Sequence, residues 1–148
     1  MNGPPPRRDL LASLMPVARA LRRIEEGAAA RDGATMWQYA ILSVVAERPG
    51  LNQREVAGAL QYSQNRIVGD LHALEERGLV LRRPGRDRRA NRLEITAAGD
   101  AVRRRVQAEI HEREDELLST LTPAQRDTFQ ATAQHLAAQA RALAPGSA

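Results

Sequence analysis

Apolar residues recur every three or four positions over most of the chain, which is the spacing of an amphipathic helix. The first such stretch, 10–24, predicts a helix with Asp9 as its N-cap, and we expect it to end within 25–35, which contains two glycines. A second stretch, 35–48, predicts another helix that a Pro-Gly pair at 49–50 terminates. The chain therefore opens with two helices.

The next segment predicts two short helices joined by a brief turn. Asn52 is an N-cap candidate with Glu55 three positions later, the spacing of a capping box, and its helix covers about 53–60. Ser63 is the N-cap candidate of the following helix, and Gly78 stands where a C′ glycine belongs. The predicted buried stripe of this second helix is Ile67, Val68, Leu71 and Leu74. Such a pair of helices is typical of a helix-turn-helix.

Downstream of these helices the pattern becomes strand-like. Residues 79–83 form a short β-capable run, 84–91 open with Pro-Gly as loops often do, and 92–96 alternate apolar and polar side chains. Two strands around a loop predict a β-hairpin. A helix-turn-helix followed by a hairpin is a winged helix, in which the hairpin is the wing.

Two long helices are predicted to close the chain, over 97–121 and 123–143, with Thr122 as the N-cap of the second. The terminal helices carry apolar stripes that a small winged helix cannot cover alone, which predicts a helical dimer interface. Examples in the last two helices are Val102, Val106, Ile110, Leu117, Leu118, Leu121, Phe129, Leu136 and Leu143.

The fold class that these elements predict is mainly α with a small β-hairpin, a winged helix-turn-helix with long N- and C-terminal dimerisation helices. The expected parts are a disordered arm (1–7), a helical dimerisation region (8–34 and 100–143), a winged helix-turn-helix DNA-binding lobe (35–99) and a flexible tail (144–148).

Missing residue types narrow the classes of function. The absence of cysteine excludes disulfides, thiolate metal sites and thiol redox sensing. No apolar run approaches the roughly 18 residues of a membrane span, and the N-terminus lacks a signal-peptide stretch, so a cytoplasmic protein is expected. The sequence shows no combination of a nucleophile and a base that would indicate an enzyme, so an enzyme is not expected. No cofactor is expected either. His111, Glu114 and His135 could form a metal site, but solvated polar faces explain them better.

Positive charge is concentrated in one segment. All 22 basic residues are arginines, and seven of them lie from Arg77 through Arg92, with a single acid, Asp87, among them. Like charges this dense repel one another unless a polyanion neutralises them, so we expect the wing to contact DNA. The alternative is a solvated charged loop. Candidate DNA-binding residues in the wing and its flanks are Arg54, Arg82, Arg86, Asp87, Arg88 and Arg89.

The start of the second helix of the helix-turn-helix carries side chains suited to base contacts. Glutamine and asparagine can pair with adenine, and arginine with guanine, in the major groove. The alternative is an ordinary polar first turn of a surface helix. The candidates in this recognition helix are Ser63, Gln64, Asn65 and Arg66.

The order of elements, together with the segments LNQREVAGAL, LEERGLVLRR, DRRANRLEIT and TAAGDAV, resembles the MarR family of winged helix-turn-helix transcriptional regulators. The resemblance covers about 8–143, and LTPAQRDTF resembles the opening of the family's last helix. The chain departs from the family at Gln61, where glycine is frequent, and at Val68 and Gly69, where relatives often carry Thr-Arg. The family's spacing near the wing is matched by Asp87, Arg89, Ile95, Thr96 and Gly99.

The resemblance implies a homodimeric, sequence-specific regulator of double-stranded DNA, most often a repressor, that binds a palindromic operator. It also implies a small aromatic or phenolic ligand held between the dimer helices and the DNA-binding lobe. An alternative function is an architectural or protein-interaction module that binds DNA with little sequence choice. Candidate residues of the ligand pocket, each of which could instead pack in the core or the dimer interface, are Met15, Met36, Trp37, Tyr39 and Ile110.

Overall fold

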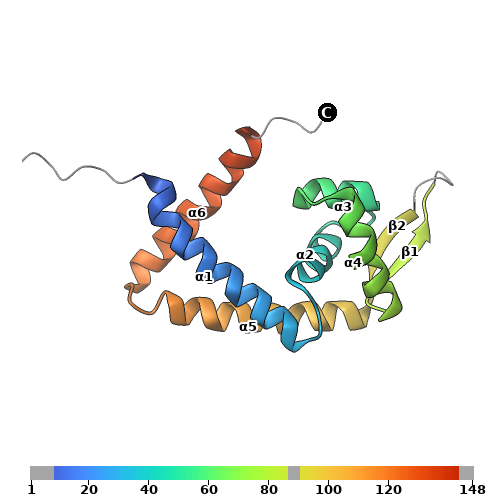
Figure 1. Cartoon of the computed structure of the whole chain (residues 1–148), viewed down its shortest axis with the longest axis horizontal. Coiled ribbons are helices and arrows are strands. Elements are labelled where there is room, and N and C mark those ends of the chain that lie inside the picture. The colour runs from blue at the N-terminus through green and yellow to red at the C-terminus, as the bar shows by residue number, and fades with distance from the viewer. Residues whose placement is uncertain (1–8, 87–90, 144–148) are drawn as a thin grey trace, which may run out of the picture. The chain divides into compact units, whose positions relative to one another are not determined.

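The computed structural model describes residues 9–86 and 91–143. It divides into two compact units, Met1–Ile110 and His111–Ala148, and each is described by itself. The predicted arm and tail lie outside the described residues, as do Asp87, Arg88 and Arg89. The elements, in chain order (Figure 1), are α1 (Leu10–Arg31), α2 (Met36–Glu47), α3 (Gln53–Leu60), α4 (Gln64–Glu76), β1 (Val80–Pro84), β2 (Asn91–Ile95), α5 (Ala97–Leu117) and α6 (Pro123–Leu143). This confirms the mainly α winged-helix fold with a small hairpin.

Helix α1 ends later than its glycines suggest. It continues through Gly27, where an added Cβ would meet nothing within 4 Å, and stops only before Gly33, whose φ is +66°. A positive φ cannot continue a right-handed helix, whereas a helical glycine costs only about 1 kcal/mol. Asp9 stands at the N-cap position, but its side chain accepts no capping hydrogen bond.

The helix-turn-helix, α3 and α4, begins and turns through local hydrogen bonds. The predicted capping box at α3 is confirmed, because Asn52 Oδ1 accepts from the Glu55 N–H at 2.9 Å and Glu55 Oε2 accepts from the Asn52 N–H at 2.8 Å. Gln61 ends α3 with a φ of 49°, the left-handed region that favours glycine. A glutamine therefore occupies the position of this turn where glycine is frequent.

The wing packs one face against the helices. Strands β1 and β2 are antiparallel, with Val80 opposite Ile95 and Arg82 opposite Leu93. Val80 and Leu93 are buried. The alternating β-pattern places Arg82 on this same inner face, whereas Leu81 lies on the outer face and is exposed. Contacts of β1 with α4 and of β2 with α2 and α3 hold the wing beside the helix-turn-helix (Figure 1).

The first half of α5 completes the core of the first unit, which is a correction to the expectation that its apolar stripe is left uncovered. Gly99 permits the approach, because an added Cβ there would lie 2.1 Å from the Leu79 carbonyl oxygen. The core residues that α5 contributes are Val102, Val106 and Ile110. They join side chains from α1 to α4 and the wing, including Ala28, Ala29, Ile41, Leu42, Val45, Val56, Ile67, Leu71, Leu74 and Leu93.

In the second unit, α5 ends at Leu117 rather than at the predicted Leu121. The Leu121 N–H donates to the Leu118 carbonyl over 3.0 Å, so the last predicted turn tightens into the connection. Thr122 caps α6 as predicted, with Gln125 completing the capping box. None of the described α6 residues is buried.

Two classes of site find no support among the described residues. No helix there combines the length and the apolar character that a membrane span requires. Nor does that part of the chain bring three or more histidine, aspartate or glutamate side chains together as metal ligands.

Candidate nucleic-acid interface

The first turn of α4 presents polar side chains to solvent. Gln64, Asn65 and Arg66 are all exposed, whereas Ile67 begins the buried stripe of the helix. Ser63 takes the N-cap position as predicted, but its hydroxyl makes no capping hydrogen bond. An uncapped helix N-terminus leaves backbone N–H groups and this hydroxyl available to an anion such as phosphate.

Val68 is a correction to the predicted buried stripe, because 37% of it is exposed. It lies on the exposed side of the helix together with Asn65 and His72, whereas Ile67 and Leu71 are buried. Gly69 lies on this face too, and an added Cβ there would meet nothing within 4 Å. We call the exposed face formed by Asn65, Val68, Gly69 and His72 the outer face of α4. It offers one amide and one apolar side chain beside an open backbone.

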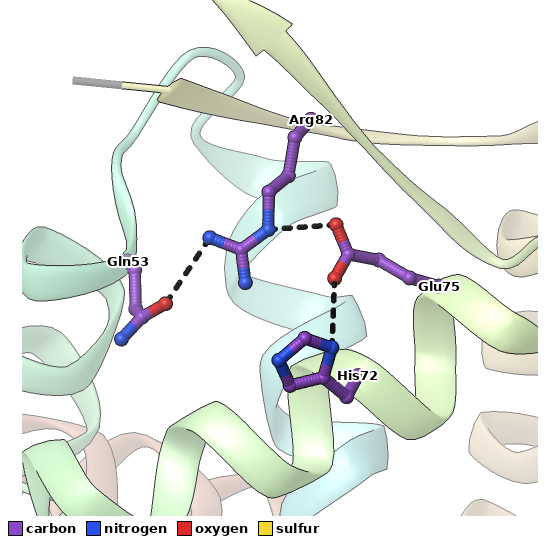
Figure 2. Close-up of polar contacts among 4 residues, drawn as sticks. All are labelled: Gln53, His72, Glu75 and Arg82. Carbon is purple, nitrogen blue, oxygen red and sulfur yellow. Dashed lines mark hydrogen bonds and ion pairs between the residues drawn. The ribbon is translucent and has the colours of Figure 1, made fainter. Parts of the chain in front are cut away.

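Arg82 ties the wing to both helices of the helix-turn-helix (Figure 2). Its Nε donates to Glu75 Oε1 of α4 over 2.7 Å, and its Nη1 donates to Gln53 Oε1 of α3 over 3.2 Å. Only 27% of the Arg82 side chain is exposed. His72 Nδ1 lies 3.9 Å from the other Glu75 oxygen. The Arg82 guanidinium, which the sequence predicts to contact DNA, therefore donates hydrogen bonds to residues of the helix-turn-helix.

The other described arginines near the wing differ in their exposure and in the partners that they bind. Arg54, at the start of α3, and Arg86, in the loop just after β1, are exposed. Arg83 pairs with Glu94 across the hairpin at 2.9 Å, with 62% and 56% of the two side chains exposed, so solvent competes for this pair. Arg92 donates to the Gly50 carbonyl, which holds β2 to the loop before α3.

A polar and aromatic cluster joins the start of α2 to α4. The rings of Trp37 and Tyr62 stack with centroids 4.1 Å apart and planes 10° from parallel. The Tyr62 hydroxyl donates to Asp70 Oδ2 over 2.8 Å, and Gln38 Nε2 donates to Asp70 Oδ1 over 3.3 Å. Burial, followed by the hydrogen bond to Asp70, raises the pKa of the Tyr62 phenol. The hydroxyl therefore remains a donor throughout the neutral range.

An open cavity of about 310 Å³ lies between the second half of α1 and the start of α2. Of the predicted pocket residues, Met36 and Trp37 line it. Ile110 is buried in the core, Tyr39 packs against that core, and Met15 lies on the exposed first half of α1. Arg22 and Glu26 form an ion pair at the rim, with Nε and Oε1 2.9 Å apart. The remaining lining residues are Ala30, Ala34 and Thr35.

Comparison with known proteins places this arrangement in one family. The model of the MarR family matches residues 32–90, from the end of α1 through the helix-turn-helix into the wing. A protein of Thauera aromatica assigned as the transcriptional regulatory protein for the hcr operon is 30% identical over 111 residues, which span 74% of this chain and 67% of that protein.

Solved structures agree over most of the chain. The transcriptional repressor CouR bound to a 23-mer DNA duplex is 29% identical, with a TM-score of 0.76 over 87% of this chain and 92% of that one. CouR from Rhodococcus jostii RHA1 bound to p-coumaroyl-CoA is 25% identical, with a TM-score of 0.72 over 87% and 91%. This chain belongs to the MarR family of winged-helix transcriptional regulators.

Proposed function

We propose that the protein is a cytoplasmic, sequence-specific DNA-binding regulator that acts as a homodimeric repressor on a palindromic operator. The observation that carries this proposal is the outer face of α4, which leaves polar, apolar and open backbone positions unoccupied beside the wing. An α-helix of this kind fits the major groove with its first turns nearest the bases. The structure of CouR bound to a DNA duplex supports DNA binding by this chain.

The first turn of α4 supplies the base contacts in this proposal. Gln64 and Asn65 pair with adenine and Arg66 with guanine or a phosphate, because these side chains present matching donor and acceptor pairs. Ser63 contacts a phosphate through the hydroxyl that does not cap the helix. These contacts set both the register and the sequence preference of each half-site.

Arginines of the wing and of α3 supply the phosphate contacts. Arg54 and Arg86 are exposed and can reach a backbone. One of Arg88 and Arg89, predicted from the sequence alone, is proposed to enter the adjacent minor groove, with Asp87 orienting the wing. Arg82 takes a different part, since its bonds to Glu75 and Gln53 hold the wing in place. A double variant Arg88→Ala and Arg89→Ala should weaken binding without unfolding the protein.

Exposed apolar residues in each unit support the homodimer. In α6, Phe129, Leu136 and Leu143 recur every seven positions and are 38%, 55% and 82% exposed. Apolar side chains at this spacing lie along one helix face and are covered when helices pair. The first two turns of α1 expose Leu10, Leu11, Leu14 and Met15. Light scattering after gel filtration tests this step, with twice the chain mass expected and the single-chain mass contradicting it.

The cavity beside α2 is proposed to hold a small aromatic or phenolic ligand that releases the operator. Its volume falls at the lower end of the range for small-molecule sites. Met36 and the Trp37 ring offer an apolar surface for a planar group. Arg22 at the rim can attract a carboxylate, in competition with Glu26. The p-coumaroyl-CoA complex of CouR supports a ligand of this chemistry.

Selection of bound fragments from sheared source DNA, followed by sequencing, tests the proposed function. Enrichment of a palindrome with half-sites about one helical turn apart is the expected result. Recovery of fragments without a shared sequence would instead favour the architectural alternative, in which the same surface binds DNA with little sequence choice.

A further inference from the structure

Asp70 receives two hydrogen bonds that both lead back to the cavity beside α2. One comes from Tyr62, whose ring stacks on the cavity residue Trp37. The other comes from Gln38, whose Oε1 accepts from the N–H of Thr35, also a cavity residue, over 3.1 Å. Two lining residues of one cavity are thus connected to the same carboxylate.

Asp70 belongs to the recognition helix. It lies one turn after Arg66, on a helix that exposes Asn65, Val68 and His72 on its outer face. Asp70 is half-buried, so its bonds are less screened than those of exposed groups. A shift of its partners therefore acts on the position of α4.

Tyr62 is held in a turn that has little freedom to absorb such a shift. It follows Gln61, whose left-handed conformation is unfavourable for a residue with a side chain. Its own N–H donates to the Ala57 carbonyl over 2.9 Å, which closes the end of α3. If the Trp37 ring moves, the stacked Tyr62 ring must either lose its partner or move with it. In the second case its hydroxyl carries Asp70 along.

We propose that Tyr62 and Asp70 are positioning residues that couple occupancy of the cavity beside α2 to the placement of the recognition helix. This rests on the proposed function, since it assigns a route for regulation of that DNA-binding surface. A planar ligand against Trp37, or a polar group that competes for the Thr35 N–H, changes the two bonds at Asp70. Coupling between two sites is reciprocal, so DNA bound at α4 must in turn change the binding free energy of the cavity, and we expect this to change the surroundings of Trp37, which lines it.

This reciprocity allows a test that needs no ligand, because Trp37 is the chain's single tryptophan. The probe is the operator duplex obtained by selection, carrying a dye whose anisotropy reports binding, while Trp37 emission is recorded in the same titration. Tyr62→Phe keeps the aromatic stack and removes the hydroxyl. Asp70→Ala removes both bonds. Glu76→Ala is the matched control, because it removes a carboxylate from the exposed end of the same helix.

The expected result is a change of Trp37 emission that follows operator binding in the native protein and in Glu76→Ala. Tyr62→Phe and Asp70→Ala should still bind the operator, about two- to tenfold more weakly, as expected for lost hydrogen bonds, and should lose the emission change. A purely structural role would weaken binding and leave the emission change in place.

Two outcomes would overturn the coupling. One is operator binding by the native protein with no change of Trp37 emission. The other is an emission change that persists in both variants. Failure of the native protein to prefer any duplex, seen in the anisotropy signal, removes the proposed function and this inference together and is distinguished from both. Should Asp70→Ala fail to bind at low salt, the conservative Tyr62→Phe variant decides.

Discussion

Arg82 Nε donates to Glu75 Oε1 over 2.7 Å, and this ion pair joins the inner face of the wing to the recognition helix. Only about a quarter of each side chain is exposed, at 27% and 24%. The pair is therefore less screened than a surface ion pair. Its chemistry makes Arg82 a structural anchor rather than a free cation for phosphate.

Glu75→Gln separates these two roles of Arg82. If Arg82 is an anchor, the variant should lower stability by about 1–2 kcal/mol and weaken DNA binding, although it removes a negative charge from the DNA-binding lobe. Urea unfolding and anisotropy titrations measure the two effects. Stronger DNA binding by Glu75→Gln would mean that the freed arginine contacts phosphate, contrary to the assignment. Arg83→Ala, which breaks only the exposed pair with Glu94, is the control and should cost less than about 0.5 kcal/mol.

Two glycines should respond in opposite directions to alanine. Gly99→Ala places a Cβ 2.1 Å from the Leu79 carbonyl oxygen, so it should destabilise the fold by about 2–4 kcal/mol or prevent folding. Gly69→Ala meets nothing within 4 Å and should stabilise the free protein by about 0.5–1 kcal/mol. Because Gly69 lies on the outer face of α4, its added methyl should weaken operator binding. Thermal unfolding alongside operator titration tests the pair, and unchanged affinity in Gly69→Ala would show that DNA does not approach this backbone.

Base contacts and phosphate contacts should differ in how they depend on sequence and salt. Asn65→Ala should cost about 1–3 kcal/mol on the operator and relax the preference at one position of each half-site. Arg54→Ala should weaken binding to all duplexes alike and reduce the salt slope by about 2 for a dimer. Titrations of operator and scrambled duplexes across a salt series measure both. The reverse pattern would exchange the roles of these two residues.

Val68 is predicted to contact a thymine methyl group. It is the apolar member of the outer face of α4, and apolar side chains recognise the thymine C5-methyl in the major groove. Replacing thymine by deoxyuridine at one position of each half-site should weaken binding by about 1 kcal/mol per half-site. Val68→Ala should bind both duplexes nearly equally. Equal binding of the two duplexes by the native protein would exclude the contact.

The sequence predicts the elements well because their ends are encoded locally. The capping boxes at Asn52 and Thr122 and the turn at the left-handed Gly78 each involve residues at most five positions apart. It does not predict the exposure of Val68, because Ile67 and Val68 are adjacent apolar residues and only tertiary packing selects which one turns inward. Similarly, Val102 and Ile110 find a cover in the lobe that periodicity alone does not reveal.

The candidate site shows the same division. Exposure of Gln64, Asn65 and Arg66 follows from the helical period and is found in the structure. The engagement of Arg82 could not be predicted, because Glu75 and Gln53 are 7 and 29 positions away and meet it only after the wing has folded against α3 and α4. The hydrogen bonds from Tyr62 and Gln38 to Asp70 likewise form only when the helices pack, so the sequence does not predict them. Charge density in the sequence indicates a candidate DNA-binding surface, but it does not tell which arginines are structural anchors.

Competition between operator and scrambled duplex tests the central claim most directly. The selected operator and a scrambled duplex of the same composition are each titrated with the dimer over a salt series. A sequence-specific regulator should bind the operator at least about 10³-fold more tightly. If each subunit neutralises about four phosphates, log K should fall against log salt with a slope of about −7. Equal affinity for the two duplexes, or a slope near zero, would contradict the account.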